Sequence, residues 1–194
     1  MASHVLALSG PRACGKSTIS KHLVNHHGYT RIAFADALRE IAKCAGDQFI
    51  DDRNYLARLG TRLREIWPRF LIEVVSQKIA RIEGPVVLED IRFPAEFEFC
   101  KSIGAVTVRL EIPRAEQLKR LLSRDGIVGD DAEHLLDCMD ENLLTGLSEW
   151  DRIYAAEGDF QQLAAALAKD MTQPGWESDY ILHQLRNFDS EAMS

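Results

Sequence analysis

The clearest candidate for chemistry is an eight-residue stretch, Gly10-Pro-Arg-Ala-Cys-Gly-Lys-Ser17, which matches the pattern G-x-x-x-x-G-K-[ST] in full. Glycine at both ends of the loop permits backbone angles and close approaches that a side chain would forbid. Successive backbone N–H groups can then form a concavity for anions at the start of a helix. Lys16 would place a positive charge on the β- and γ-phosphates, and the Ser17 hydroxyl would bind Mg²⁺. The stretch therefore predicts a site for a nucleoside triphosphate and Mg²⁺.

The loop follows an apolar, strand-like run and precedes a helical one, which is the context that the pattern requires. The residues expected to contact the nucleotide are Gly10, Ala13, Cys14, Gly15, Lys16, Ser17 and Thr18, the last through the α-phosphate. Cys14 has two interpretations: a thiol activated by the helix N-terminus, or a small residue that fills space. We favour the second.

Acidic side chains stand at the ends of two further strand-like runs. Asp36 follows the second run, where a carboxylate could accept a proton from an acceptor hydroxyl, hold an acceptor sugar or base, or cap a helix that starts at Ala37. Glu89 and Asp90 end the third run, and an acidic residue there can hold Mg²⁺ through its waters. Because side chains alternate along a strand, only one of the two should face the phosphates. A solvated strand end is the simpler alternative.

Several arginines could bind phosphate, because a guanidinium stays charged and binds phosphate through paired hydrogen bonds. Arg92 follows Asp90 by two residues, and it could instead form a structural ion pair with Glu96 or Asp90. Arg120 and Arg124 are four residues apart on one predicted helix face and could neutralise charge that develops during phosphoryl transfer. Alternatively, they suit the dipole of a helix C-terminus.

A further group of arginines falls between the second and third strands. Five arginines and one glutamate occupy residues 53–69, at Arg53, Arg58, Arg62, Arg64 and Arg69. The apolar stripe of a helix runs here through Leu56, Leu59, Leu63 and Ile66. Arg62 lies at the edge of this stripe, where a long side chain can reach a neighbouring cleft, while Arg58 and Arg64 lie about 120° from its centre. The excess of arginine suggests a surface for an anionic substrate; a solvated helix face is the alternative.

The elements that must position these residues alternate between strands and helices. Apolar runs predict strands at 5–9, 31–35, 85–89, 106–112 and 152–155. Helical periodicity predicts helices at 16–27, 37–45, 52–66, 69–82, 95–103, 114–124 and 160–170, with a break at Pro68. Near-continuous apolar strands separated by helices are typical of a parallel sheet in an α/β fold. We expect one domain over residues 1–170 and a tail at 171–194.

Composition limits the class of protein. With 194 residues, 46% hydrophobic and 27% charged, the chain is long enough for one core and has no run apolar enough for a membrane helix. Residues 1–95 hold 14 Lys and Arg against 10 Asp and Glu, whereas residues 96–194 hold 9 against 20. The acidic total disfavours non-specific nucleic-acid binding, although the basic half can meet anionic ligands. Four widely spaced cysteines and the lack of a signal peptide favour a reduced, cytoplasmic setting.

Three later segments occur in a familiar order: Phe34-Ala-Asp36-Ala-Leu-Arg39, then Leu59-Gly-Thr-Arg62, then Asp90-Ile-Arg92-Phe-Pro-Ala-Glu96. Together with the phosphate loop they resemble the phage-type deoxynucleoside monophosphate kinases, a branch of the P-loop nucleoside monophosphate kinases. The resemblance covers residues 4–170. It implies a three-layer α/β/α fold with a five-stranded parallel sheet, a helical acceptor-binding insert at about 37–83, and a lid at about 125–149.

The resemblance also implies roles for residues that match its motifs. Asp90 is chosen over Glu89 as the metal-binding acid, beside Ser17. The acceptor would be bound by Asp36, Arg39, Arg62 and Arg92, and the catalytic residues would be Lys16, Asp36, Asp90, Arg120 and Arg124. The cofactors would be ATP and Mg²⁺.

Three functions follow as alternatives. The favoured one is transfer of the γ-phosphoryl of ATP to a deoxynucleoside monophosphate, mainly by positioning and charge neutralisation. The second is phosphorylation of the hydroxyl of 5-hydroxymethyluracil within DNA, which similar phage kinases carry out, with Asp36 as the base and DNA as the partner. The third is an ATP-binding switch without turnover. No membrane partner is expected, and homodimer formation is left open.

Overall fold

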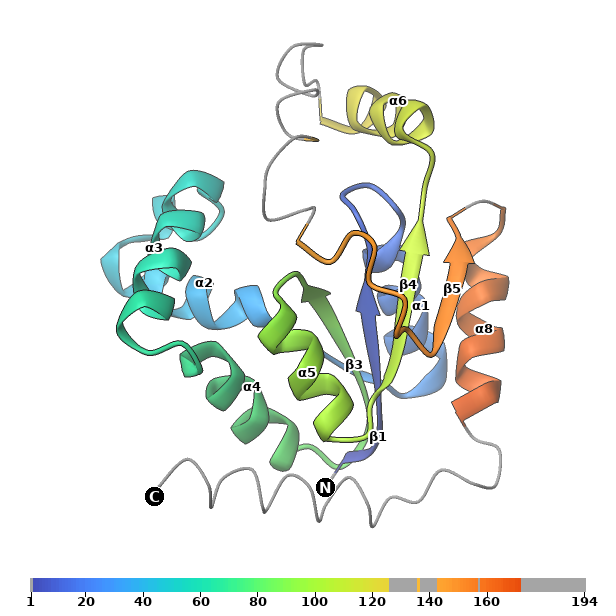
Figure 1. The fold of residues 1–194 in the computed structure, drawn as a ribbon, viewed down its shortest axis with the longest axis horizontal. Coiled ribbons are helices and arrows are strands. Elements are labelled where there is room, and N and C mark those ends of the chain that lie inside the picture. The colour runs from blue at the N-terminus through green and yellow to red at the C-terminus, as the bar shows by residue number, and fades with distance from the viewer. Residues whose placement is uncertain (1, 126–135, 137–142, 157, 172–194) are drawn as a thin grey trace.

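A computed structural model of the chain describes residues 2–125, 136, 143–156 and 158–171, apart from the side chains of residues 124 and 125 (Figure 1). Its centre is a sheet of five parallel strands. They are β1 (Ala2–Ser9), β2 (Thr30–Ala33), β3 (Gly84–Ile91), β4 (Val106–Glu111) and β5 (Arg152–Ala155), in the order β2-β3-β1-β4-β5. Because the strands are all parallel, their carboxyl ends share one edge of the sheet, where open α/β sheets bind ligands.

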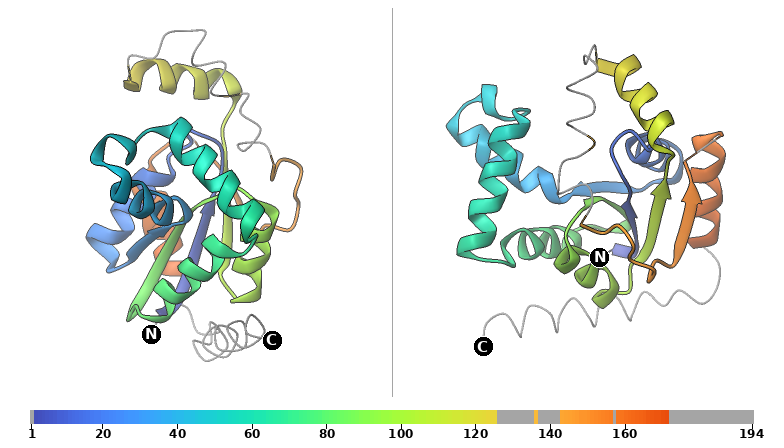
Figure 2. Two further views of the ribbon diagram at one scale, coloured as in Figure 1. Left: turned by 90° about the vertical axis from the view of Figure 1, so that its left-hand side faces the viewer. Right: turned by 45° about the horizontal axis from the view of Figure 1, so that its top comes forward.

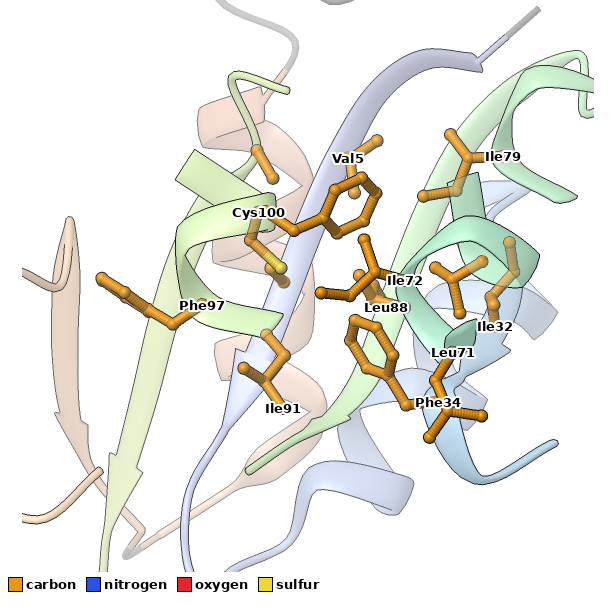
Figure 3. Close-up of a cluster of buried hydrophobic side chains, with 14 of the residues drawn as sticks. Val5, Ile32, Phe34, Leu71, Ile72, Ile79, Leu88, Ile91, Phe97 and Cys100 are labelled. Carbon is orange, nitrogen blue, oxygen red and sulfur yellow. The ribbon is translucent and has the colours of Figure 1, made fainter. Parts of the chain in front are cut away.

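Helices cover both faces of the sheet and make a three-layer fold. On one face lie α1 (Lys16–His27) and α8 (Phe160–Met171), whose apolar residues share a core cluster with Leu6 and Leu8 of β1. On the other lie α2 (Phe34–Ala45), α4 (Phe70–Ala80) and α5 (Pro94–Ser102), which pack against Val5 and Ala7 of the same strand. Figure 3 shows this second cluster around Leu88 and Ile72. Burial of alternate residues on opposite faces explains why the strands are almost continuously apolar.

The segment between β2 and β3 forms the helical insert that the sequence predicts. It holds α2, a short 3₁₀ turn at Asp47–Phe49, α3 (Arg53–Ile66) and α4. Asp52 caps α3, because its side chain accepts a hydrogen bond from the Tyr55 N–H at 3.0 Å. The predicted break at Pro68 is confirmed, since α3 ends at Ile66 and α4 begins at Phe70. Figure 2 shows α3 standing at the outer side of α2, away from the sheet.

One predicted boundary is wrong in a way that affects the site. The predicted strand 31–35 ends at Ala33, and α2 begins at Phe34 rather than at Ala37. Phe34 is 2% exposed and belongs to the core cluster, so an apolar residue read as the end of a strand is the first residue of a helix. The sequence pattern does not distinguish a strand from a helix for a single buried aromatic residue.

The remaining helix, α6 (Arg114–Asp125), follows β4 and leads into the region predicted as a lid. Of residues 126–149 the structure describes 136 and 143–149, where Leu144 packs into the core beside Trp150. The rest of the predicted lid, and the tail from residue 172, lie outside the described residues.

Candidate functional site

The predicted phosphate loop runs from the end of β1 to the start of α1, at the carboxyl edge of the sheet. Its backbone is left-handed at three positions: Gly10 has φ 143°, Ala13 has φ 60° and Gly15 has φ 98°. A side chain at Gly10 would place its Cβ 2.5 Å from the carbonyl oxygen of Leu110, so the loop passes too close to β4 for any residue but glycine. The loop therefore has the curved, strained backbone that anion-binding loops use.

Lys16 turns back over this loop. Its Nζ donates hydrogen bonds to the carbonyl oxygens of Gly10 at 2.6 Å and Pro11 at 3.0 Å, and it lies 3.7 Å from the sulfur of Cys14. The ammonium group is thus held against the backbone of the predicted phosphate loop. Ser17 and Thr18 are exposed and lie in the first turn of α1, where the Thr18 N–H donates to the carbonyl oxygen of Gly15 at 3.0 Å. Cys14 is fully buried, which favours the interpretation that it fills space.

Gly15 is covered by the aromatic ring of Phe160, the first residue of α8. A Cβ at Gly15 would lie 2.6 Å from a ring carbon, which ordinary contacts do not permit. Arg120 lies near the same ring, since its guanidinium is 5.4 Å from the centre of the Phe160 ring.

Arg120 is fixed by contacts to three separate elements. It donates to Glu116 on its own helix at 3.0 Å, to the carbonyl oxygen of Ala156 after β5 at 2.9 Å, and to that of Ala13 in the phosphate loop at 3.4 Å. The hydrogen bond from Arg120 lowers the pKa of Glu116. The alternative, that Arg120 only suits the dipole of a helix C-terminus, does not account for its hydrogen bond to the phosphate loop. Arg124 lies one turn further along α6, and its side chain is outside the described residues.

The end of β3 lies beside the start of this loop and is irregular. Ala7 pairs with Leu88, but Ser9 pairs with Ile91, so Glu89 and Asp90 together face a single residue of β1. Asp90 has φ 62°, and Ala13 is the other non-glycine residue with positive φ in the described part of the chain. Such a bulge redirects side chains at a strand end, and left-handed residues cluster at functional sites. It leaves the Asp90 carboxylate partly exposed, next to the strand that carries the loop.

Glu89, by contrast, is buried on the α1 face, which it shares with Val87 by alternation. Its Oε2 accepts a hydrogen bond from Nε of Arg31 at 2.7 Å, while its Oε1 has no hydrogen-bond partner among the described residues. Burial opposes the charge on Arg31, but Glu89 and Asp36 outweigh it and raise the pKa of the guanidinium. Sequence reasoning missed Arg31, and a charged residue inside a short apolar strand was the signal that could have found it.

Asp36 lies in the first turn of α2 and is the centre of a small charged network. Its Oδ2 accepts from the Ala33 N–H at 2.9 Å and from Arg31 at 3.0 Å, and its Oδ1 accepts from Arg39 at 3.1 Å. The predicted N-cap role is therefore corrected: Asp36 is the third residue of the helix and reaches back to satisfy a free N–H at its start. Arg39 also lies 3.8 Å from Asp51.

Arg92 stands at the turn between β3 and α5, held by Glu96. The backbone N–H groups of Arg92 and Phe93 donate to Oε2 of Glu96 at 2.9 and 3.2 Å, and Arg64 donates to Oε1 at 3.0 Å. Burial raises the pKa of Glu96, against the opposing effect of these hydrogen bonds. Glu96 therefore binds the backbone of Arg92, whereas the guanidinium of Arg92 lies 3.8 Å from Asp90.

Arg62 does not join these residues. Its side chain is 76% exposed and is hydrogen-bonded to Glu65 at 2.6 Å on the same helix. Arg64 is the arginine of α3 that reaches the start of α5, where it contacts Phe93 and Glu96. The spacing of the apolar stripe predicts the angular positions of Arg62 and Arg64 around the helix, but it does not predict which segment lies beside each side chain.

A cavity of about 230 Å³ adjoins the phosphate loop on the β4 side. It is lined by Pro11, Arg109, Ile112, Arg114, Gln117, Leu136 and Thr145. Gln117 donates to the carbonyl oxygen of Arg12 at 2.9 Å, so α6 is attached to the loop at this point as well. Arg109 was missed by sequence reasoning, although an arginine within the apolar run of β4 is unusual.

Two findings concern other ligands. None of the described helices is long and apolar enough to cross a membrane. In the described part of the chain, no three His, Cys, Asp or Glu side chains gather as a ready metal site. The predicted Mg²⁺ ligands, Ser17 and Asp90, would leave most positions to phosphate oxygens and water, as is usual for this ion.

Comparison with solved structures finds the same fold in other proteins, among them two kinases. TT1252 from Thermus thermophilus is 20% identical, with a TM-score of 0.57 over 87% of this chain and 96% of that chain. A gluconokinase from Sinorhizobium meliloti 1021 is 16% identical, with a TM-score of 0.52 over 87% and 95%. A shikimate kinase from Bacteroides thetaiotaomicron is 14% identical, with a TM-score of 0.53 over 88% and 99%.

No model of a known protein family matches the sequence, and no curated protein matches it. At these identities the likeness to solved structures shows the fold alone. The chain has the α/β/α fold of P-loop kinases, with a five-stranded parallel sheet, and the predicted fold class is confirmed.

Proposed function

We propose that this protein is an ATP- and Mg²⁺-dependent phosphotransferase whose acceptor is a deoxynucleoside monophosphate. The observation that carries the proposal is the loop itself. Lys16 lies over a left-handed, glycine-bounded backbone, and Arg120 is hydrogen-bonded to the same loop from α6. A site of this kind combines an anion cradle with two fixed positive charges, which is what phosphoryl transfer requires of a protein.

The residues present fit ATP and Mg²⁺. The backbone of residues 10–18 and the ammonium of Lys16 would hold the phosphates, and Ser17 with Asp90 would hold the metal. When bound, Mg²⁺ supplies charge neutralisation on the β- and γ-phosphate oxygens. In the reaction an oxygen of the acceptor forms a bond to the γ-phosphorus while the bond to the β–γ bridging oxygen breaks. Lys16 and Arg120 stabilise the negative charge on both sides of that exchange.

The hydrogen bonds of Asp36 favour an acceptor that is already ionised. An alcohol acceptor needs a base, and Asp36 is the residue predicted for that role. Its two oxygens accept three hydrogen bonds, two from arginine side chains and one from a backbone N–H. A carboxylate held in this way is a positioning group for Arg31 and Arg39. A monophosphate oxygen carries its own negative charge and reacts without a base, which favours a nucleotide acceptor over a hydroxyl.

The test is transfer of label from γ-labelled ATP with Mg²⁺ in the presence of one acceptor at a time. The acceptors are the four deoxynucleoside monophosphates, duplex DNA with and without 5-hydroxymethyluracil, and the small alcohols shikimate and gluconate, after which two of the structural neighbours are named. We expect label on one or more monophosphates. Label on modified DNA alone, or on an alcohol alone, would overturn the assignment of the acceptor. Absence of label on every acceptor would contradict the proposed activity.

A matched pair of variants makes the assay specific to the loop. Lys16→Ala should lower the rate by about 10²-fold or more, because it removes one fixed charge at the transferred group. Lys21→Ala removes the same charge from an exposed position on the same helix and should keep the rate of the unaltered protein. Equal rates for the two variants would show that the label is transferred at another site.

A further inference from the structure

A glycine in the middle of α3 marks a contact between the insert and the end of β3. Glycine is unfavourable inside a helix, so its presence at Gly60 needs a reason. A Cβ there would lie 2.9 Å from a guanidinium nitrogen of Arg64 and 3.1 Å from Leu38 of α2. Gly60 therefore makes room for the Arg64 side chain to cross its own helix and for α2 to pack closely.

The Arg64 side chain uses this room to reach the turn before α5. The central carbon of its guanidinium lies 3.7 Å from the centre of the Phe93 ring, and one terminal nitrogen donates to Glu96 at 3.0 Å. Phe93 on one side and Gly60 on the other leave the side chain 24% exposed. This enclosure favours a fixed role over direct contact with a substrate.

Glu96 connects the Arg64 side chain to the backbone of the turn before α5. It is 2% exposed, and its second oxygen accepts the N–H groups of Arg92 and Phe93. A buried carboxylate needs a nearby positive charge to remain ionised, and hydrogen bonds to an ionised acceptor are about twice as strong as neutral ones. The charge of Arg64 thus supports the two hydrogen bonds that fix the backbone on which the Arg92 side chain stands.

We propose that Arg64 is a positioning residue for acceptor binding, which acts through Glu96 on Arg92 and attaches helix α3 of the insert to the turn between β3 and α5. The proposal rests on the proposed function and on the prediction, drawn from the family resemblance, that Arg92 binds the acceptor. Arg64 itself is not expected to touch a substrate. Because α3 stands away from the sheet (Figure 2), this contact joins the acceptor insert to the strand end beside the phosphate loop.

Steady-state kinetics of Arg64→Met test the proposal. We expect KM for the acceptor to rise by about tenfold, the effect of losing one or two ordered hydrogen bonds, while KM for ATP stays within twofold. Arg81→Met is the matched control, since it removes the same charge from an exposed position at the end of the neighbouring helix α4. Arg64→Lys keeps the charge without the planar stacking and should fall between the two.

Backbone hydrogen exchange supplies a readout that does not depend on turnover. In Arg64→Met, the amides of Arg92 and Phe93 should exchange at least about tenfold faster than in Arg81→Met, while the core strand amides of β1 exchange unchanged. Arg64→Lys serves if Arg64→Met fails to fold. Equal exchange and equal acceptor KM in the Arg64→Met and Arg81→Met variants would overturn the proposal. If the unaltered protein phosphorylates no acceptor, the proposed function fails, and the exchange experiment still decides whether Arg64 fixes the turn.

Discussion

The close approach of the phosphate loop to β4 makes a quantitative prediction for Gly10. Gly10→Ala places a Cβ 2.5 Å from a backbone carbonyl oxygen and 2.9 Å from the sulfur of Cys14, at a φ of 143°. Gly28, at the end of α1, has a φ of 70° and nothing within 4 Å of the same added atom. Both substitutions force a left-handed backbone on alanine, but only the first also creates a clash.

The two contributions can be separated. A non-glycine residue in the left-handed region costs about 1–2 kcal/mol, and overpacking adds about 1–3 kcal/mol when the neighbour cannot move away. Gly28→Ala should therefore lower the free energy of unfolding by about 1–2 kcal/mol, and Gly10→Ala by about 2–5 kcal/mol. Because the carbonyl oxygen belongs to β4, relief of the clash must shift the loop. Gly10→Ala should also weaken ATP binding at least about tenfold, whereas Gly28→Ala should leave it unchanged.

Urea denaturation followed by circular dichroism measures the first quantity, and calorimetric titration with Mg²⁺ and ATP measures the second. An equal loss of stability in the two alanine variants would show that the loop does not approach β4 as described. Unaltered ATP affinity in Gly10→Ala would refute the link between the backbone of this loop and nucleotide binding.

Three other predictions use the same protein. Arg120→Met should lower kcat about 10³-fold in the labelled-ATP assay, while Lys119→Met, which alters a side chain 79% exposed on the same helix, should change it less than twofold; equal effects would contradict the role of Arg120. Asp36→Asn should lower kcat by about tenfold or less if this residue positions arginines, whereas a loss of 10³-fold or more would identify it as a base. Burial raises the pKa of Tyr29 to about 12, above its value in the unfolded chain, so the free energy of unfolding should fall as pH rises from 10 to 12; a Tyr29→Phe variant with the same decline would contradict this cause.

The sequence predicted the loop, the strands and most helix boundaries because these depend on local features. The spacing of Gly10, Gly15 and Lys16 specifies the loop, and Pro68 specifies the break between α3 and α4. Periodicity placed every helix of the sheet layers within a few residues. The second strand was misjudged at its end, because the buried residue Phe34 suits a strand and a helix equally.

The contacts between side chains of distant segments were beyond sequence reasoning. Arg31 and Glu89 meet because β2 and β3 are neighbours in a particular register. The bulge at Glu89 and Asp90 is a separate irregularity, in the pairing of β3 with β1. The helical wheel places Arg62 and Arg64 on either side of an apolar stripe but says nothing about what lies beside α3. Such contacts depend on tertiary packing, which one sequence does not specify residue by residue.

Binding of ATP to the loop is the claim on which the proposed reaction, the acceptor site and the role of Arg64 all depend. Isothermal titration calorimetry of the unaltered protein with ATP in excess Mg²⁺ tests it directly. We expect saturable binding of one ATP per chain, weakened at least about tenfold in Lys16→Ala and unchanged in Lys21→Ala. A flat titration with ATP, or the same affinity in Lys16→Ala as in the unaltered protein, would contradict it.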